Sequence, residues 1–190
     1  MAQSSERDAP GADAVATFDR TRLAMNRARQ RLKEAEELVA SGLPAGLDDA
    51  WAAAVEWTVW VVALDDHVTT VLGRDRRDAL VDEQEKGSAL TRVGGRLAGL
   101  RYLRNLHAHQ LAETLRVLPH DAVLRPSQRL AWAPFDALPL PDRQSKHTDA
   151  QQEAYRKHIA GVWVGPIAQR ISVAFGASAW RDALTEAEAG

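Results

Sequence analysis

Hydrophobic residues recur with a helical period along most of the chain, and glycines and prolines separate the periodic segments. The segment beginning at Ser88 has that serine as an N-cap candidate, and Gly165-Pro166 is expected to kink or break the last helix. The expected helices cover residues 14–40, 47–72, about 76–85, 88–118 and 149–184. The pattern predicts an all-α fold, a helical bundle of four or five helices.

Two segments depart from the helical pattern. Residues 1–12 contain serine, proline and glycine with almost nothing to bury, which is typical of a flexible tail. Residues 119–148 contain five prolines, too many for a continuous helix, together with apolar residues such as Leu130, Trp132 and Phe135. We expect this Pro-rich insertion to be an ordered loop or a small β-hairpin. A length of 190 residues is then typical of a single domain, here residues 1–190.

Composition excludes several kinds of chemistry. The chain has no cysteine, which rules out a catalytic thiol, a cysteine-ligated zinc ion, an iron–sulfur cluster and a disulfide. His107 and His109 are two residues apart, which is poor spacing for metal ligands on a helix, and no phosphate-cradling glycine motif is present. No uncharged stretch approaches the roughly 18 residues of a membrane span, and no secretory h-region occurs at the start. We expect a cytoplasmic protein without a cofactor, a metal or a membrane contact.

The basic residues cluster in one segment. The whole chain has a formal net charge of −2, but residues 87–118 contain five arginines and only one acidic residue, Glu113. Such a local excess of positive charge indicates either a solvated helix face or a site for a phosphate-bearing ligand.

One arginine of this segment lies at an unexpected place on the helical wheel. Arg104 falls in the middle of the apolar stripe that contains Leu97 and Leu100. A guanidinium there needs an acidic partner or a bound anion, since it cannot lose its charge. Asp65 and Asp66 of the 47–72 helix are candidate partners, and an open cleft that receives a phosphate is the alternative, which we favour.

The same wheel places two leucines outside the apolar stripe. Leu103 and Leu106 fall on faces that would be wet in an isolated surface helix. They require either another helix of the bundle or a second subunit, and the spacing of Gly95 and Gly99 also permits a close approach of helices. We predict that this seam joins two copies of the chain in a homodimer, although an intramolecular seam fits about as well.

Two polar residues border the stripe at a spacing that favours contact. Asn105 and His109 are four residues apart and therefore share one helix face. An imidazole oriented by a neighbour and placed beside positive charge, here Arg101 and Arg104, is a candidate general acid or base near neutral pH. His107 has no comparable neighbours and is interpreted as a polar surface residue.

The segment Arg104-Asn105-Leu106-His107-Ala108-His109 resembles the Arg-polar-xxx-His motif of the HEPN superfamily, helical domains found in many prokaryotic ribonucleases and toxins. The resemblance implies metal-independent cleavage of RNA, in which the 2′-hydroxyl attacks the adjacent phosphodiester. It implies that His109 is the acid or base, that Arg104 stabilises charge on the phosphate, and that Asn105 orients the imidazole or a ribose hydroxyl. Arg101 is a further substrate-binding candidate, and Asp65 and Asp66 are candidate supporting acids. Members of the superfamily usually act as dimers.

One position departs from the family pattern. HEPN toxins that are silenced by a nucleotidyltransferase carry a tyrosine two residues after the motif histidine, and this chain has Leu111 there. Silencing by AMP transfer to a tyrosine is therefore not expected. The leading interpretation is an endoribonuclease that serves as a toxin or defence effector and is opposed by an antitoxin. The alternatives are a non-catalytic HEPN-like module that binds RNA, a nucleotide or a protein, and an unrelated helical scaffold.

Overall fold

The computed structural model describes residues 13–43, 45–86, 92–110, 114–120, 127–139 and 146–189. Three sequence-based expectations fall outside these residues: the flexible tail 1–12, the Ser88 N-cap and the substitution at Leu111. Among the described residues, no helix is long and apolar enough to cross a membrane.

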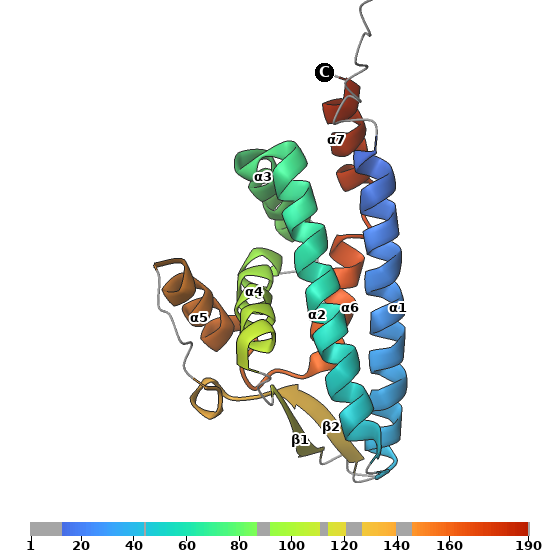
Figure 1. Ribbon diagram of the computed structural model, residues 1–190, viewed down its shortest axis with the longest axis vertical. Helices are drawn as coiled ribbons and strands as arrows, with labels where there is room; N and C mark the ends of the chain where they lie inside the picture. The colour runs from blue at the N-terminus through green and yellow to red at the C-terminus, as the bar shows by residue number, and fades with distance from the viewer. Residues whose placement is uncertain are drawn as a thin grey trace, which may run out of the picture.

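Two long antiparallel helices form the centre of the bundle (Figure 1). In α1 (Ala14–Ala40) the largest buried side chains are seven residues apart, at Phe18, Met25, Leu32 and Val39, so they form one stripe along the helix. That stripe packs on α2 (Ala45–Leu72), whose residues are apolar on most sides. Gly42, with a φ of 76°, adopts the left-handed conformation in the turn between the two helices.

The remaining elements surround this pair. Helix α3 (Arg74–Lys86) follows α2 after Gly73, and α4 (Val93–Gln110) packs between α2 and α5 (Lys146–His158) (Figure 1). Strands β1 (Leu115–His120) and β2 (Ser127–Trp132) pair in antiparallel register from Leu115 opposite Trp132 to His120 opposite Ser127. A short 3₁₀ turn, η1 (Phe135–Ala137), follows the hairpin, and α6 (Val164–Ala174) and α7 (Ser178–Ala189) pack on α1.

The expected all-α bundle with a small β-hairpin is confirmed, but some boundaries differ. The helix expected to end at Leu118 has given way to strand β1 by Leu115, because the backbone pairs with β2 and Ala133 N–H donates to the Thr114 carbonyl (2.8 Å). The described residues form seven α-helices rather than four or five. Gly165-Pro166 lies in the first turn of α6, where proline is tolerated, and the preceding helix ends before Gly161 instead.

The two glycines of α4 serve a seam within the chain. A β-carbon at Gly99 would lie 2.7 Å from Ile159 Cγ1 and 3.0 Å from Tyr155 Cα, and one at Gly95 would meet the His158 ring. Both positions therefore let α4 approach α5 closely.

Because the Tyr155 backbone cannot move aside easily, Gly99→Ala is expected to destabilise the fold by about 1–3 kcal/mol through overpacking. Gly94→Ala is the matched control in the same helix, since its β-carbon would meet Val81 Cγ1 at an ordinary 3.4 Å. Urea denaturation of both variants measures the difference. Equal stability of the two variants would show that the α4–α5 approach is looser than described.

Candidate active site

The buried face of α4 differs from the one expected. Leu103 and Leu106 are buried inside the chain, in the same core as Leu97 and Leu100, because α4 is covered by both α2 and α5. The expectation that these two leucines present a seam to a second subunit is therefore wrong. Arg104 is also not at the centre of the buried face: its side chain is 37% exposed.

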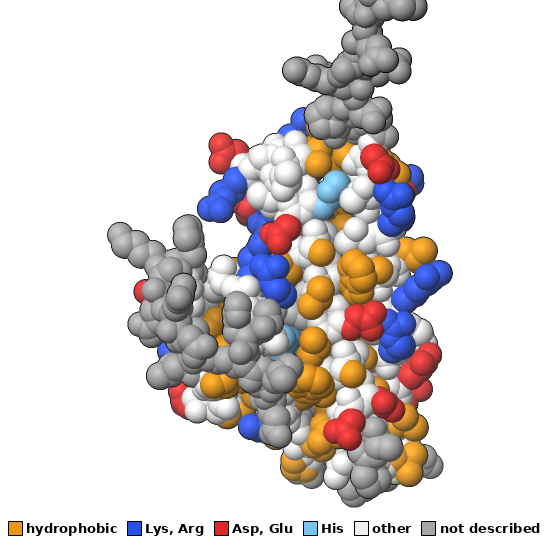
Figure 2. All heavy atoms as spheres, viewed as in Figure 1, with side chains coloured by type: hydrophobic (Ala, Val, Ile, Leu, Met, Phe, Trp, Pro, Cys, Tyr) orange, Lys and Arg blue, Asp and Glu red, His pale blue; other side chains and the backbone are white. Residues whose placement is uncertain are grey.

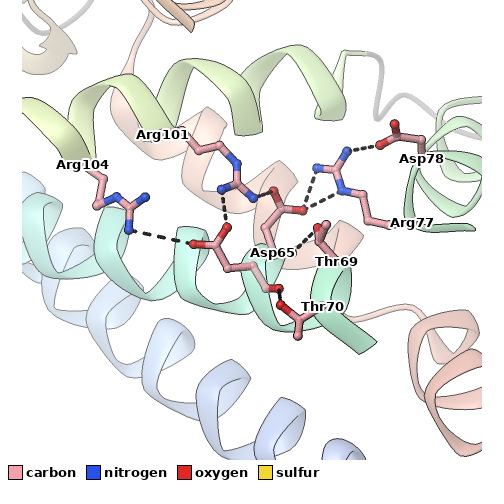
Figure 3. Close-up of polar contacts among 8 residues, drawn as sticks. Asp65, Thr69, Thr70, Arg77, Asp78, Arg101 and Arg104 are labelled. Carbon is pink, nitrogen blue, oxygen red and sulfur yellow. Dashed lines mark hydrogen bonds and ion pairs between the residues drawn. The ribbon is translucent and has the colours of Figure 1, made fainter. Parts of the chain in front are cut away.

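Asp65 of α2 forms the buried centre of a cluster of charged side chains from α2, α3 and α4. Its side chain is only 1% exposed, and both carboxylate oxygens are occupied. Arg77 of α3 donates to Oδ1 from Nε (2.8 Å) and lies 2.6 Å away through Nη2, and Arg101 of α4 donates to Oδ2 from Nη2 (2.6 Å). Three helices are thus held together at one carboxylate (Figure 3).

Asp66 extends the cluster toward solvent. Arg101 also donates to Asp66 Oδ1 through Nη1, so this one guanidinium bridges both aspartates. Burial lowers the pKa of the Arg101 guanidinium, but the attraction and hydrogen bonds of Asp65 and Asp66 outweigh it and raise the pKa overall. The expected contact of Arg101 with substrate stays a prediction, because this side chain is engaged by two carboxylates.

Arg104 is the most loosely held cation of the cluster. Its Nη1 lies 3.9 Å from Asp66 Oδ2, beyond hydrogen-bond distance, and Asp65 is occupied by the other two arginines. The geometry therefore favours an arginine open to an anion over a buried ion pair. Figure 2 shows one patch of basic side chains between α2 and α4 with acidic side chains beside it, and further basic side chains along the edge of α1.

A cleft of about 490 Å³ runs beside this cluster. Its walls come from four helices, α2, α3, α4 and α5, and the small residues Gly94 and Ala98 line it on the α4 side. The charged and polar lining includes Asp65, Asp66, Arg74, Arg77, Asp78, Arg101 and Gln151. Asn105 Nδ2 donates to Gln151 Oε1 at 3.3 Å, which places this motif residue next to the cleft.

The backbone of His109 lies in α4, one turn after Asn105, but its side chain is outside the described residues, as are the side chains of 108 and 110. The structure thus brings together Arg101, Arg104, Asp65 and Asp66 from two helices, and it leaves the predicted Asn105–His109 contact untested.

His107 differs from its expected place on the surface. It is buried, its Nε2 shares a hydrogen bond with Thr114 Oγ1 (2.9 Å), and its ring meets Trp51 edge-on at 6.3 Å. Burial lowers the pKa of His107 to about 4, so the imidazole is neutral near pH 7. The interpretation of His107 as a polar surface residue is therefore wrong, because Trp51 of α2 and Thr114 lie against its ring.

His107 is expected to make stability depend on pH. In the unfolded chain it binds a proton near pH 6.5 and in the fold only near 4, so its contribution is fully present above pH 6.5 and is lost as the pH falls toward 4. The loss amounts to about 3 kcal/mol over that window. Urea denaturation of wild type and His107→Gln at pH 7 and 4.5 measures it. Parallel losses in both proteins would contradict the burial of a neutral imidazole.

Among the described residues, no group of three or more histidines and acids is arranged to hold a metal ion. No family model matches the chain, and no curated protein or solved structure matches it. The resemblance to HEPN domains thus rests on the motif in α4 and its helical setting, and it remains a prediction.

Proposed function

We propose that this protein is a metal-independent endoribonuclease of HEPN type that acts as a toxin or defence effector. Arg104, Asn105 and His109 are the proposed catalytic residues, all carried by α4. No cofactor is part of the proposal.

The observation that carries the proposal is the state of Arg104. A half-exposed guanidinium with one carboxylate at 3.9 Å can accept a phosphate without the cost of breaking a hydrogen-bonded ion pair. Asn105 follows it in the sequence and donates to Gln151, which lines the cleft beside the charge cluster. The planar, two-pronged guanidinium of a partly exposed arginine is well suited to bind a phosphodiester.

The proposed reaction is a transesterification. His109 takes the proton of the 2′-hydroxyl as its oxygen forms a bond to the adjacent phosphorus, and Arg104 stabilises the charge that develops on the phosphoryl oxygens. The bond from phosphorus to the 5′-oxygen breaks, and the imidazolium returns the proton to that oxygen. The products are a 2′,3′-cyclic phosphate and a 5′-hydroxyl, and no water is consumed.

Incubation of total RNA with the purified protein in EDTA tests the proposal. Wild type is expected to fragment the RNA, and His109→Ala is expected to leave it intact while keeping the same circular dichroism spectrum. Binding without any fragmentation would favour the alternative, a non-catalytic HEPN-like module. Equal fragmentation by both proteins would remove His109 from the reaction.

The partners in this proposal are RNA, a second copy of the chain and an antitoxin protein, in the cytoplasm. Because Leu103 and Leu106 are buried within the chain, a dimer requires another surface. Figure 2 shows exposed hydrophobic side chains over α1 and α2. Two of the exposed large hydrophobic residues of these helices are Leu38 and Val59, which are 39% and 42% exposed. Light scattering measures the oligomeric state directly.

A further inference from the structure

A chain of alternating positive and negative side chains links α3 to Arg104. Its first two members, Asp78 and Arg77, were not predicted from the sequence. It runs Asp78, Arg77, Asp65, Arg101, Asp66, Arg104 (Figure 3). The contacts up to Asp66 are hydrogen-bonded, and only the last one, from Asp66 to Arg104, is longer than a hydrogen bond.

Arg77 determines which oxygen of the Asp65 carboxylate is left for Arg101. The two contacts from Arg77 reach Asp65 Oδ1, which leaves Oδ2 alone for Arg101. Arg101 consequently has its second nitrogen, Nη1, free to bind Asp66. Without Arg77, the buried Asp65 would have a single cation within reach, and a buried carboxylate draws such a cation onto both of its oxygens.

Asp66 is the carboxylate that competes with a phosphate for Arg104. Its side chain is 44% exposed and lies between two arginines, with one oxygen held by Arg101 and the other 3.9 Å from Arg104. The chain of alternating charges contains three arginines and three aspartates, but Arg77 is bonded to Asp78 and Asp65 and Arg101 to Asp65 and Asp66, whereas Arg104 has only the long contact with Asp66. Arg104 is therefore the arginine of this chain of charges whose charge is least compensated by a close carboxylate.

We propose that Arg77 is a positioning residue for Arg104: by saturating one oxygen of Asp65 it lets Arg101 hold Asp66 away from Arg104, which stays open to an RNA phosphate. This inference rests on the proposed function, because it takes the anion at Arg104 to be a phosphodiester. Arg77 itself is largely buried and is directed at Asp65, so it acts through Arg101 and Asp66 and not by contact with RNA.

The consequence of removing Arg77 is specific. Arg101 then turns both of its nitrogens to the buried Asp65, and Asp66 is released to close on Arg104. Arg77→Gln is therefore expected to bind RNA as weakly as Arg104→Gln does. Asp66→Asn in the Arg77→Gln protein removes the competing carboxylate and restores binding.

Binding of a fluorescent, fully 2′-O-methylated RNA oligonucleotide, which lacks the attacking hydroxyl, tests this apart from cleavage. Anisotropy titrations over a range of salt concentrations give the slope of log K against log salt. For a single strand, the magnitude of this slope falls by about 0.7 for each phosphate that the protein no longer neutralises. We expect that decrease for Arg104→Gln and Arg77→Gln, and the wild-type slope for Arg77→Gln/Asp66→Asn.

Arg76→Gln is the matched control, because Arg76 lies on the same helix, loses the same charge and bonds Glu186 of α7 instead. It should keep the wild-type slope. A normal slope for Arg77→Gln beside a reduced one for Arg104→Gln overturns the inference and leaves the proposed function standing. A normal slope for Arg104→Gln overturns the phosphate contact itself, and the inference with it.

A second variant covers the case in which Arg77→Gln does not fold. Asp66→Asn alone should keep the wild-type slope, because Arg101 already holds Asp66 away from Arg104. A slope steeper by about 0.7 would mean that Asp66 neutralises Arg104 in the wild type, and it would overturn the inference.

Discussion

Asp65→Asn is expected to lower the free energy of unfolding by about 3–5 kcal/mol, the range measured when one member of a buried ion pair is removed. Arg77 and Arg101 both have Asp65 as their buried acceptor, and their side chains are only 13% and 23% exposed. Loss of the carboxylate charge leaves two largely buried guanidinium groups with one carboxylate fewer between them. Urea denaturation at pH 7 measures the change.

Arg104→Ala provides the contrast within the same cluster. Its contact with Asp66 is long and half-exposed, so its removal is expected to change stability by less than about 1 kcal/mol. A loss of several kcal/mol in Arg104→Ala would mean that this arginine is a structural partner of Asp65 or Asp66. Its assignment to the phosphate would then need independent evidence.

The largest expected effects are on the cleavage rate. Removal of a positioned acid or base typically costs about 10²–10⁴-fold, and we expect His109→Ala to fall in that range. Arg104→Ala is expected to lose about 10²–10³-fold, as for other groups that stabilise developing charge. Arg104→Lys keeps the charge but not the two-pronged contact, so it should lie between Arg104→Ala and wild type.

Single-turnover cleavage of a defined RNA oligonucleotide measures these rates. Arg20→Ala is the control for loss of an arginine, because Arg20 is 68% exposed and pairs with Asp13 on the surface of α1. It should cleave at the wild-type rate. A rate for Arg104→Ala equal to that of Arg20→Ala would show that Arg104 contributes only its overall charge.

Much of the fold could be predicted from the sequence. The stripe from Phe18 to Val39 repeats every seven residues, and local periodicity of this kind needs no knowledge of the rest of the chain. The residue at which α4 ends could not be predicted in the same way, because Leu115 and Leu118 continue the helical period of Leu97 and Leu111. Their place in β1 depends on pairing with β2, a contact that a helical wheel does not represent.

The site was only partly predictable for a similar reason. The charge of Arg104 and the position of Asp65 and Asp66 on the neighbouring helix marked the cluster from the sequence. Which arginine pairs with which aspartate depends on how α3 folds back after Gly73, and this brings Arg77 to Asp65 and leaves Arg104 at the edge. The burial of His107 likewise depends on tertiary contacts, with Trp51 of α2 and with Thr114.

The central claim is that RNA is cut by its own 2′-hydroxyl without a metal. Two oligonucleotides of one sequence test it most directly: one all-ribose, the other with a single 2′-deoxynucleotide on the 5′ side of the mapped cleavage site. In EDTA, wild type is expected to cut only the first at that bond and to leave a 2′,3′-cyclic phosphate and a 5′-hydroxyl. Cleavage of the deoxy-substituted bond, products with a 3′-hydroxyl and a 5′-phosphate, or loss of activity in EDTA would contradict the mechanism.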